Sequence, residues 1–337
     1  MYPTTPLPLI GRSRSRPNLL VLAVTVLVPM LGACTEQQDA AELSGPDLAP
    51  AFARGGNGGN NGRILFRSDR HNPGSEKMDL YSMNPDGSGV TRLTSDPGTE
   101  GYAAWSPDGK KIAFTSDRDD PSGEIYVMNA DGTGVTRLTF STGYDVEPRW
   151  SKDGKRIVFV TTRFAANPDS PASNELEIMT MNADGTGLTR LTSNAAGDAG
   201  PDWSSDGKRI VFSSNRADPN ADVFDIFVMN PDGTNVTQLT VGGILNLWPV
   251  WAPGGKQIAF NGVDGINVMN ADGTNRTLIA PGNDIEALPF WSDDGKYIVF
   301  NQDVGGNREI FVMNADGTNM TRLTFSQGAD VAVAWRR

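Results

Sequence analysis

Short runs of apolar residues recur along most of this chain, separated by turns rich in Gly, Asp, Asn and Pro. In one stretch, residues 112–114 (Ile-Ala-Phe) and 125–128 (Ile-Tyr-Val-Met) are apolar at successive positions rather than at alternating ones. Short runs of this kind are typical of strands that are buried on both faces of a sheet. We therefore expect short strands in sheets that are covered on both sides.

The pattern repeats from residue 63 onward, and a tryptophan marks each repeat. The marker tryptophans are Trp105, Trp150, Trp203, Trp251, Trp291 and Trp335. Their spacings of 45, 53, 48, 40 and 44 residues are close to the ~40–45 residues of a four-stranded propeller blade. Each repeat offers a strand that ends at the tryptophan, two apolar strands, and a last strand of the Val-Thr-Arg-Leu-Thr type.

The two ends of the repeat region predict a closed ring rather than an open stack. Residues 63–66 begin at the second strand of a repeat, whereas residues 331–335 form a first strand without the rest of its repeat. The C-terminal strand would complete the first blade, which removes exposed sheet edges. The expected fold is all-β: a six-bladed β-propeller of four-stranded blades over residues 62–337.

The turns follow the same repeat. The loop before the last strand ends only in Gly or Asn, at Gly89, Gly134, Gly187, Asn235, Asn275 and Asn319. An exchange restricted to these two residue types is typical of a position with positive φ. Turn formation therefore explains the neighbouring Asp residues and Asn-x-Thr sequences better than metal binding or glycosylation does.

Two recurring motifs carry a resemblance to a known family. Trp-Ser-Pro-Asp-Gly-Lys at 105–110 and Tyr-Val-Met-Asn-Ala-Asp-Gly at 126–132 resemble the WD40-like (PD40) repeats of the TolB family. The resemblance covers about residues 63–337 and concerns the propeller domain alone, because residues 35–61 leave no room for the α/β domain of that family. It implies a six-bladed propeller. The role of TolB with its lipoprotein partner is not transferred.

The N-terminal residues have the pattern of an export signal. Three arginines, at 12, 14 and 16, precede an apolar run at 19–30 that is shorter than the ~20 residues of a membrane-spanning helix. The run ends in Leu-Gly-Ala-Cys at 31–34, which resembles the lipobox of bacterial lipoproteins, and Cys34 is the only cysteine. We expect a signal peptide at residues 1–33 and lipidation of Cys34.

The residues that follow the signal would connect the lipid to the propeller. Residues 34–61 are rich in Gly, Asn and Ala and contain nothing that could build a core, so we expect a flexible tether. Thr35, rather than Asp, follows the cysteine, which by resemblance favours the outer membrane, with the protein facing the periplasm. The sequence thus predicts a bacterial envelope protein held by an N-terminal lipid.

Composition excludes several kinds of chemistry. The net charge of −11 argues against nucleic acid as a partner. One His and one Cys cannot form a Cys/His zinc site or a multi-His metal centre, and no nucleophile-elbow motif is present. His71 is expected to be a surface loop residue. We predict no catalytic residues, no cofactor and no dedicated metal site.

Alignment of the repeats on their tryptophans reveals a mostly acidic position five residues earlier. Its residues are Glu100, Asp145, Asp198, Asn246, Glu286 and Asp330. In a propeller the chain enters the innermost strand here, so we expect these side chains around one mouth of the central channel. They would form a docking funnel for a basic group or a cation site, for instance for calcium.

Arginines leave a second interpretation of this acidic ring open. They follow the second strand of four blades, at Arg70, Arg118, Arg163 and Arg216. Acid and arginine would then pair between neighbouring blades and hold them in register. The last two blades lack this arginine, so Glu286 and Asp330 are expected to have no partner.

Two aromatic residues, Tyr102 and Trp248, stand three positions before the tryptophan of their own repeat. They would form a recognition patch for a peptide or a sugar beside the mouth, or they would plug the channel. The sequence leaves both possibilities open.

The sequence predicts a non-catalytic, envelope-tethered binding or scaffold module whose channel-mouth face engages a protein, a peptide or a glycan. The alternative is a carboxylate-based glycan hydrolase or lyase built from the acidic ring, because paired carboxylates need no His. Recurrence of the ring in nearly every repeat favours binding, since an active site is asymmetric.

Overall fold

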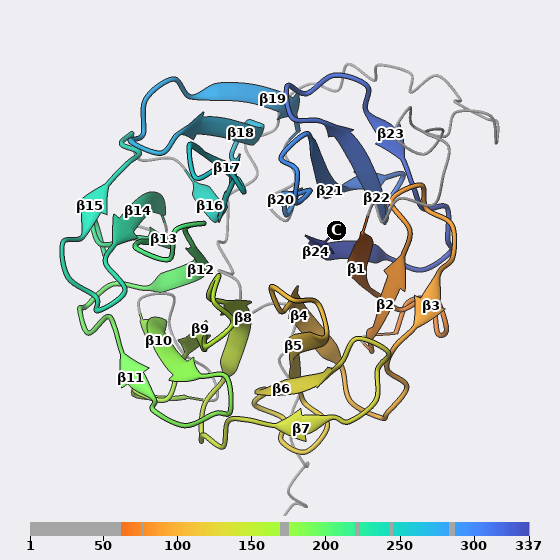
Figure 1. Ribbon diagram of the computed structural model, residues 1–337, viewed down its shortest axis with the longest axis horizontal. Helices are drawn as coiled ribbons and strands as arrows, with labels where there is room; N and C mark the ends of the chain where they lie inside the picture. The colour runs from red at the N-terminus through yellow and green to blue at the C-terminus, as the bar shows by residue number, and fades with distance from the viewer. Residues whose placement is uncertain are drawn as a thin grey trace, which may run out of the picture.

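The computed structural model describes residues 62–75, 77–168, 175–219, 223–242, 245–282 and 287–336. Its strands form six antiparallel four-stranded sheets that stand around a central axis as the blades of a propeller (Figure 1). The predicted fold is confirmed. The described residues include no helix of the length and apolarity needed to cross a membrane. Cys34 and the predicted tether lie outside these ranges.

The innermost strand of each blade ends at or next to a marker tryptophan. These strands are β4 (Glu100–Trp105), β8 (Asp145–Trp150), β12 (Asp198–Trp203), β16 (Asn246–Trp251), β20 (Phe290–Trp291) and β24 (Asp330–Arg336). The second strands are β1 (Arg63–Ser68), β5 (Lys111–Ser116), β9 (Arg156–Thr161), β13 (Ile210–Ser214), β17 (Gln257–Gly262) and β21 (Tyr297–Val304).

The two outer positions of each blade are filled in chain order. The third strands are β2 (Asp79–Met83), β6 (Glu124–Asn129), β10 (Glu177–Asn182), β14 (Asp225–Met229), β18 (Gly265–Asn270) and β22 (Asn307–Asn314). The outermost strands are β3 (Thr91–Arg92), β7 (Thr136–Arg137), β11 (Thr189–Arg190), β15 (Thr237–Gln238), β19 (Thr277–Pro281) and β23 (Thr321–Arg322).

The ring is closed by the two ends of the repeat region. Strand β24 pairs antiparallel with β1, with Asp330 opposite Ser68 and Val331 opposite Arg67. Blade 1 is therefore β24-β1-β2-β3, and blades 2 to 6 follow as β4–β7, β8–β11, β12–β15, β16–β19 and β20–β23. Because this pairing covers the inner edge of β1, the predicted closure is confirmed.

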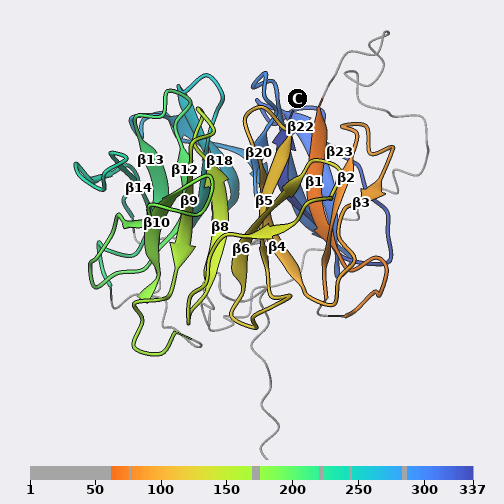
Figure 2. The same ribbon diagram turned by 60° about the horizontal axis from the view of Figure 1, so that its bottom comes forward.

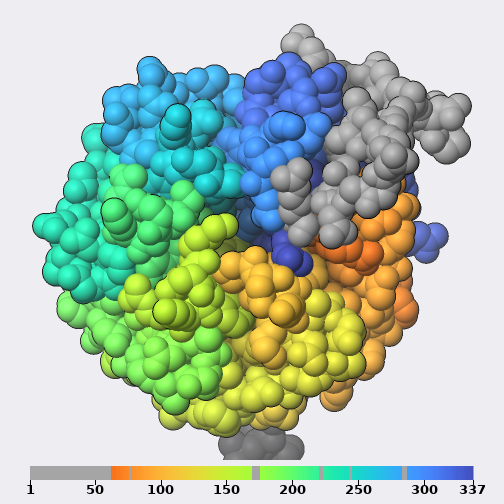
Figure 3. All heavy atoms as spheres, in the orientation of Figure 1, coloured from red at the N-terminus to blue at the C-terminus, as the bar shows by residue number. Residues whose placement is uncertain are grey.

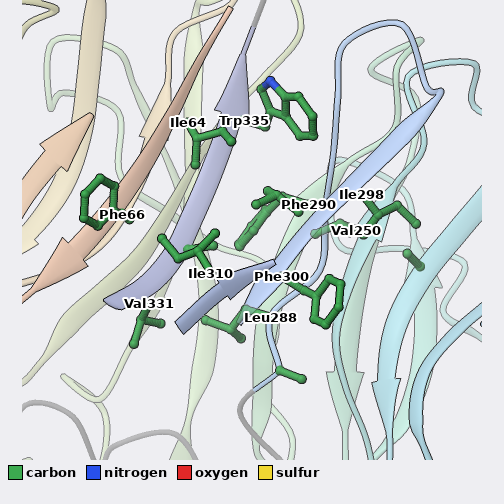
Figure 4. Packing of buried hydrophobic residues seen from close by; sticks show 14 of the residues in the cluster. Ile64, Phe66, Val250, Leu288, Phe290, Ile298, Phe300, Ile310, Val331 and Trp335 are labelled. Atoms are coloured by element: carbon green, nitrogen blue, oxygen red, sulfur yellow. The ribbon is translucent and has the colours of Figure 1, made fainter. Parts of the chain in front are cut away.

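The marker tryptophans pack between blades. Trp150 of blade 3 shares a buried cluster with Ile125 and Val127 of blade 2, and Trp203 of blade 4 clusters with Val158 of blade 3. Figure 4 shows the corresponding cluster where β24 and β1 meet the strands of blade 6. Each large ring thus removes apolar surface of two blades from water, which holds the blades together.

The connections gather at two opposite faces (Figure 2). We call the face that carries the turns after the innermost and the third strands the turn face, and the opposite face the loop face. The predicted Gly/Asn positions of the turn face have positive φ in every repeat, for example 66° at Gly134 and 54° at Asn235. The interpretation of these residues as turn formers is confirmed.

Candidate functional site

The predicted acidic ring is buried inside the blades instead of lining an open mouth. Its described members lie at the first residue of their innermost strands, and each has an exposed fraction of 0%: Glu100, Asp145, Asp198, Asn246 and Asp330. Glu286 lies outside the described residues. We call these five residues the ion-pair layer.

Each acid of the ion-pair layer binds an arginine. The ion pairs are Arg70–Asp330 at 2.8 Å, Arg118–Glu100 at 3.1 Å, Arg163–Asp145 at 2.5 Å and Arg216–Asp198 at 2.7 Å. Both partners belong to the same blade, so the predicted pairing between neighbouring blades is wrong. The prediction that Asp330 has no partner is also wrong, because β24 lies in the sheet of β1 and the arginine that follows β1 is Arg70.

Neutral side chains make the contacts between neighbouring blades at this level. The hydroxyl of Thr94, in blade 1, donates to Glu100 of blade 2 at 2.9 Å. The amide of Asn246, in blade 5, donates to Asp225 of blade 4 at 3.2 Å. Burial raises the pKa of Glu100 to about 8, with the nearby Asp96 acting in the same direction and Arg118 opposing.

A second set of buried carboxylates escaped the analysis of the sequence. They lie at or near the start of the third strands. Four of them bind the arginine of the adjacent outermost strand, in the pairs Asp79–Arg92, Glu124–Arg137, Glu177–Arg190 and Glu309–Arg322, at 2.6 to 3.0 Å. In the sequence, these pairs were signalled by the acid that recurs near the start of the third strand and by the Thr-Arg of the fourth strand. No group of three His, Cys, Asp or Glu suited to a metal occurs in the described ranges, so the calcium hypothesis has no ligand set there.

The centre of the channel is closed by residues three positions before the tryptophans. We call Tyr102, Glu147, Gly200, Trp248 and Leu288 the bulge layer; they line a void of only about 20 Å³. Tyr102 of blade 2 and Trp248 of blade 5 stack with their ring centroids 5.6 Å apart. The two rings thus meet in the channel, as the plug interpretation expects.

The backbone of the bulge layer is unusual. The innermost strands shift register at this level, for instance between Val146 and Arg149 and between Leu247 and Val250. Glu147 and Trp248 have φ values of 59° and 56°, in a region that bulky residues rarely occupy. The bulges place these two side chains against the small void at the channel centre.

Glu147 is a buried acid without an ion-pair partner at contact distance in the described part of the chain. Its exposed fraction is 5%, and it accepts a hydrogen bond from the backbone N–H of Gly200 at 2.8 Å. Burial raises its pKa to about 7, while Arg149 and Arg67 oppose this from farther away. The carboxyl is therefore close to half protonated near neutral pH.

The open part of the channel is a funnel on the turn face. Its floor is formed by all six residues that directly precede the marker tryptophans, which we call the floor layer: Ala104, Arg149, Asp202, Val250, Phe290 and Ala334. Its wall includes the marker tryptophans Trp105, Trp150, Trp251, Trp291 and Trp335. The cavity measures about 210 Å³, and Figure 3 looks onto the hollow at the centre of this face.

The floor layer combines an apolar surface with two charged groups. Arg149 lies 5.0 Å over the ring of Phe290 and donates to the carbonyl of Ala103 at 3.2 Å. Asp202 accepts a hydrogen bond from the backbone N–H of Trp251 at 2.8 Å, and burial raises its pKa to about 6. Sequence reasoning missed this layer; the signal was a position that varies from repeat to repeat beside a constant tryptophan.

Two family models match the repeat region. Residues 75–173 match the Tricorn protease N-terminal beta propeller domain, and residues 169–266 match the TolB beta propeller domain. Over residues 169–266 the chain thus resembles the TolB propeller. The resemblance inferred from the repeat motifs is therefore confirmed, whereas the lipoprotein signal remains a prediction.

Solved structures share the fold of this TolB-like propeller. TolB from Acinetobacter baumannii is 22% identical with a TM-score of 0.68, covering 85% of this chain and 69% of that one. A putative TolB from Agrobacterium tumefaciens is 21% identical with a TM-score of 0.58, covering 80% and 90%. An oligogalacturonate lyase from Vibrio parahaemolyticus is 14% identical with a TM-score of 0.53, covering 77% and 74%. No curated protein matches the chain in sequence.

The ion-pair layer predicts a large cost for breaking one pair. Asp198→Ala leaves Arg216 without its carboxylate beside a buried site, and we expect the free energy of unfolding to fall by about 3–5 kcal/mol. The matched control is Asp264→Ala, which breaks the more exposed pair with Arg276 and should cost no more than about 1 kcal/mol. Urea unfolding of both variants measures the difference, and equal costs would contradict the prediction.

Glu147 predicts a pH dependence of stability. Its pKa is 4.5 when unperturbed and about 7 in the TolB-like propeller, so between these values the folded state keeps a proton that the unfolded state has lost. The free energy of unfolding should therefore fall as pH rises through this window, by an amount on the order of 3 kcal/mol from this group. Glu100 and Asp202 act with the same sign.

Glu147→Gln tests this expectation, because the amide keeps an acceptor for the N–H of Gly200 and cannot lose a proton. The difference between the urea midpoints at about pH 5 and about pH 7.5 should be smaller for the variant than for the wild type. An unchanged pH slope in the variant would show that Glu147 titrates at its ordinary pKa in the folded protein.

Proposed function

We propose that this TolB-like propeller is a non-catalytic binding module, held in the bacterial envelope by a lipid on Cys34, that engages a protein partner in the funnel of the turn face. The observation that carries the proposal is the funnel itself. It is concave, about 210 Å³ in volume, walled by tryptophans and floored by an arginine and an aspartate. Aromatic side chains and arginine are the residues most enriched at the energetic centres of protein interfaces.

The site differs from the acidic ring that the sequence favoured. The acids of the ion-pair layer are buried and bound to arginine, which leaves them no surface to offer a ligand. The funnel lies at the other end of the channel, where the floor layer varies from blade to blade. An asymmetric floor on a symmetric ring suits recognition of one partner.

The rival function, a glycan hydrolase or lyase, has weaker support. Such chemistry needs two carboxyl groups flanking one bond. The funnel lining holds two carboxylates in different layers, Asp202 in the floor layer and Asp293 in the turn after β20. The buried acid of the bulge layer, Glu147, lines a void of about 20 Å³, which is too small for a sugar. The likeness to an oligogalacturonate lyase, at 14% identity, concerns the fold alone.

The funnel predicts a position-dependent crosslink to a partner. A photoreactive amino acid at Lys152, on the funnel rim, should form one defined protein adduct in the envelope, whereas the same group at Thr133, in an exposed turn after β6, should not. Filling the floor with Ala104→Phe should abolish the adduct in a protein that still melts cooperatively. An adduct that survives the filling variant would remove the funnel as the binding site.

The lipid anchor has a separate test. We expect globomycin, which blocks lipoprotein signal peptidase, to cause accumulation of the unprocessed precursor, and Cys34→Ser to release the protein from the membrane fraction. A serine substitution at a position outside the lipobox, Thr35→Ser, is the matched control. Processing that is unaffected by the drug would rule out Cys34 as the anchor and would leave the funnel proposal intact.

A further inference from the structure

The funnel is a blind pocket. Arg149, Val250 and Phe290 line both the funnel and the small void beneath it, so the two spaces meet at the floor layer. Below that floor, the stacked rings of Tyr102 and Trp248 close the channel. A polypeptide therefore cannot thread through the propeller, and a ligand that reaches the floor must enter with one end first.

The floor carries a guanidinium with unused donors. Arg149 donates through Nη1 to the carbonyl oxygens of Ala103 and Pro148, at 3.2 and 3.3 Å, and its Nε and Nη2 bind no acceptor among the described residues. The four arginines that pair with the acids of the ion-pair layer, by contrast, each bind a carboxylate at 3.1 Å or less. Arg149 has no such partner in the described part of the chain, although Asp202 and Glu147 act on it from farther away.

The funnel is locally positive in an acidic protein. Its lining contains three cations, Arg149, Lys152 and Arg336, and two carboxylates, Asp202 and Asp293, whereas the whole chain has a net charge of −11. Arg336 is held at the rim by the carbonyl oxygens of Asp108 and Gly109, so its charge is not neutralised by an acid at that contact. A cavity with low-dielectric aromatic walls focuses such a field on an entering anion.

The size of the funnel limits what it can hold. Pockets for whole small-molecule ligands measure about 300–1,000 Å³, and this one measures about 210 Å³. The exposed lining is mostly polar, and the edges of the tryptophan rings, with Val250 and Phe290, add a smaller apolar part that suits an apolar group. The space therefore fits roughly one residue that presents an apolar side chain to the wall and a negative charge to the floor.

The geometry points to a peptide carboxyl terminus as the ligand: the last residue of the partner, apolar in side chain, inserts into the funnel and its terminal carboxylate binds the Nε and Nη2 side of Arg149. A carboxylate is the anion that a guanidinium binds through two parallel hydrogen bonds. A chain end fits all three observations: the pocket admits a peptide only by one end, it has room for roughly one residue, and its floor is positively charged. This inference rests on the proposed function, because it names the group that the funnel accepts.

The test compares one peptide in two chemical forms. N-acetyl-Gly-Ser-Ala-Leu is titrated into the wild-type protein as the free acid and as the carboxamide, and tryptophan fluorescence and calorimetry report binding. We expect the acid to bind at least about tenfold more tightly than the amide, as one charge-assisted bidentate contact requires. Equal affinity of the two forms, or no binding of the acid at the highest soluble concentration, would overturn the inference.

Further probes separate the other sources of a carboxylate. N-acetyl-Gly-Asp-Ala-Leu-amide carries the acid on a side chain, and glucuronic acid carries it on a sugar. We expect both to bind more weakly than the free-acid peptide. Stronger binding by the aspartyl peptide would assign the funnel to an internal acidic residue, and stronger binding by glucuronic acid would assign it to an acidic glycan; either result overturns the chain-end assignment.

Two variants locate the contact. Arg149→Met keeps an unbranched stem over Phe290 and removes the charge, so it should abolish the difference between acid and amide. Arg209→Met is the control, since Arg209 lies 4.7 Å over the ring of Trp251 without lining the funnel, and it should keep the difference. If Arg149→Met does not fold, the comparison of acid and amide on the wild type decides by itself.

The two proposals fail in different ways. If the rim crosslink at Lys152 still captures a partner and is lost on filling the floor, while acid and amide bind alike, only the carboxyl-terminus inference is wrong. If the crosslink is independent of the filling variant, the funnel is not the binding site and both proposals fall.

Discussion

Crowding at the central axis is the constraint on which the rest of this molecule depends. Six innermost strands converge there, and each can direct side chains inward only at alternate positions. The result is a stack of layers: the ion-pair layer inside the blades at the loop face, the bulge layer at the centre, and the floor layer under the turn face. At the centre, Tyr102 of blade 2 and Trp248 of blade 5 stack and leave a void of only about 20 Å³, which is too narrow for a polypeptide to pass.

The buried charges serve the order of the ring more than its stability. A buried ion pair such as Arg216–Asp198 gains little net free energy, because desolvation offsets the attraction between the charges. It does penalise any arrangement in which the acid at the start of an innermost strand fails to meet the arginine after the second strand of its own sheet. Hydrogen bonds between blades, such as Thr94 to Glu100, extend this to the neighbouring blade. The blades are then fixed closely enough to hold the six residues of the floor layer around one cavity.

The repeat made the fold readable from the sequence. Three local patterns predicted structure at the expected residues: the consecutive apolar residues of the second and third strands, the marker tryptophans, and the Gly/Asn turn positions. The candidate site was less readable. Glu100 and Arg118 were recognised as possible partners, but their ion pair lies within one blade, and the partner of Asp330 was missed although closure of the ring by β24 assigns it to Arg70.

The sequence by itself determined the strands, their order, the turns and the closure. These follow from the local pattern of apolar residues and from the turn residues, both of which recur in every repeat. The tertiary structure alone decided which face is open and which side chains meet there. Arg149, Asp202 and Phe290 stand in three different repeats, and Tyr102 lies 146 positions from Trp248 in the chain. Such residues come together only because a closed ring brings the same position of every blade to one axis, and no local pattern reports how much space is left between them.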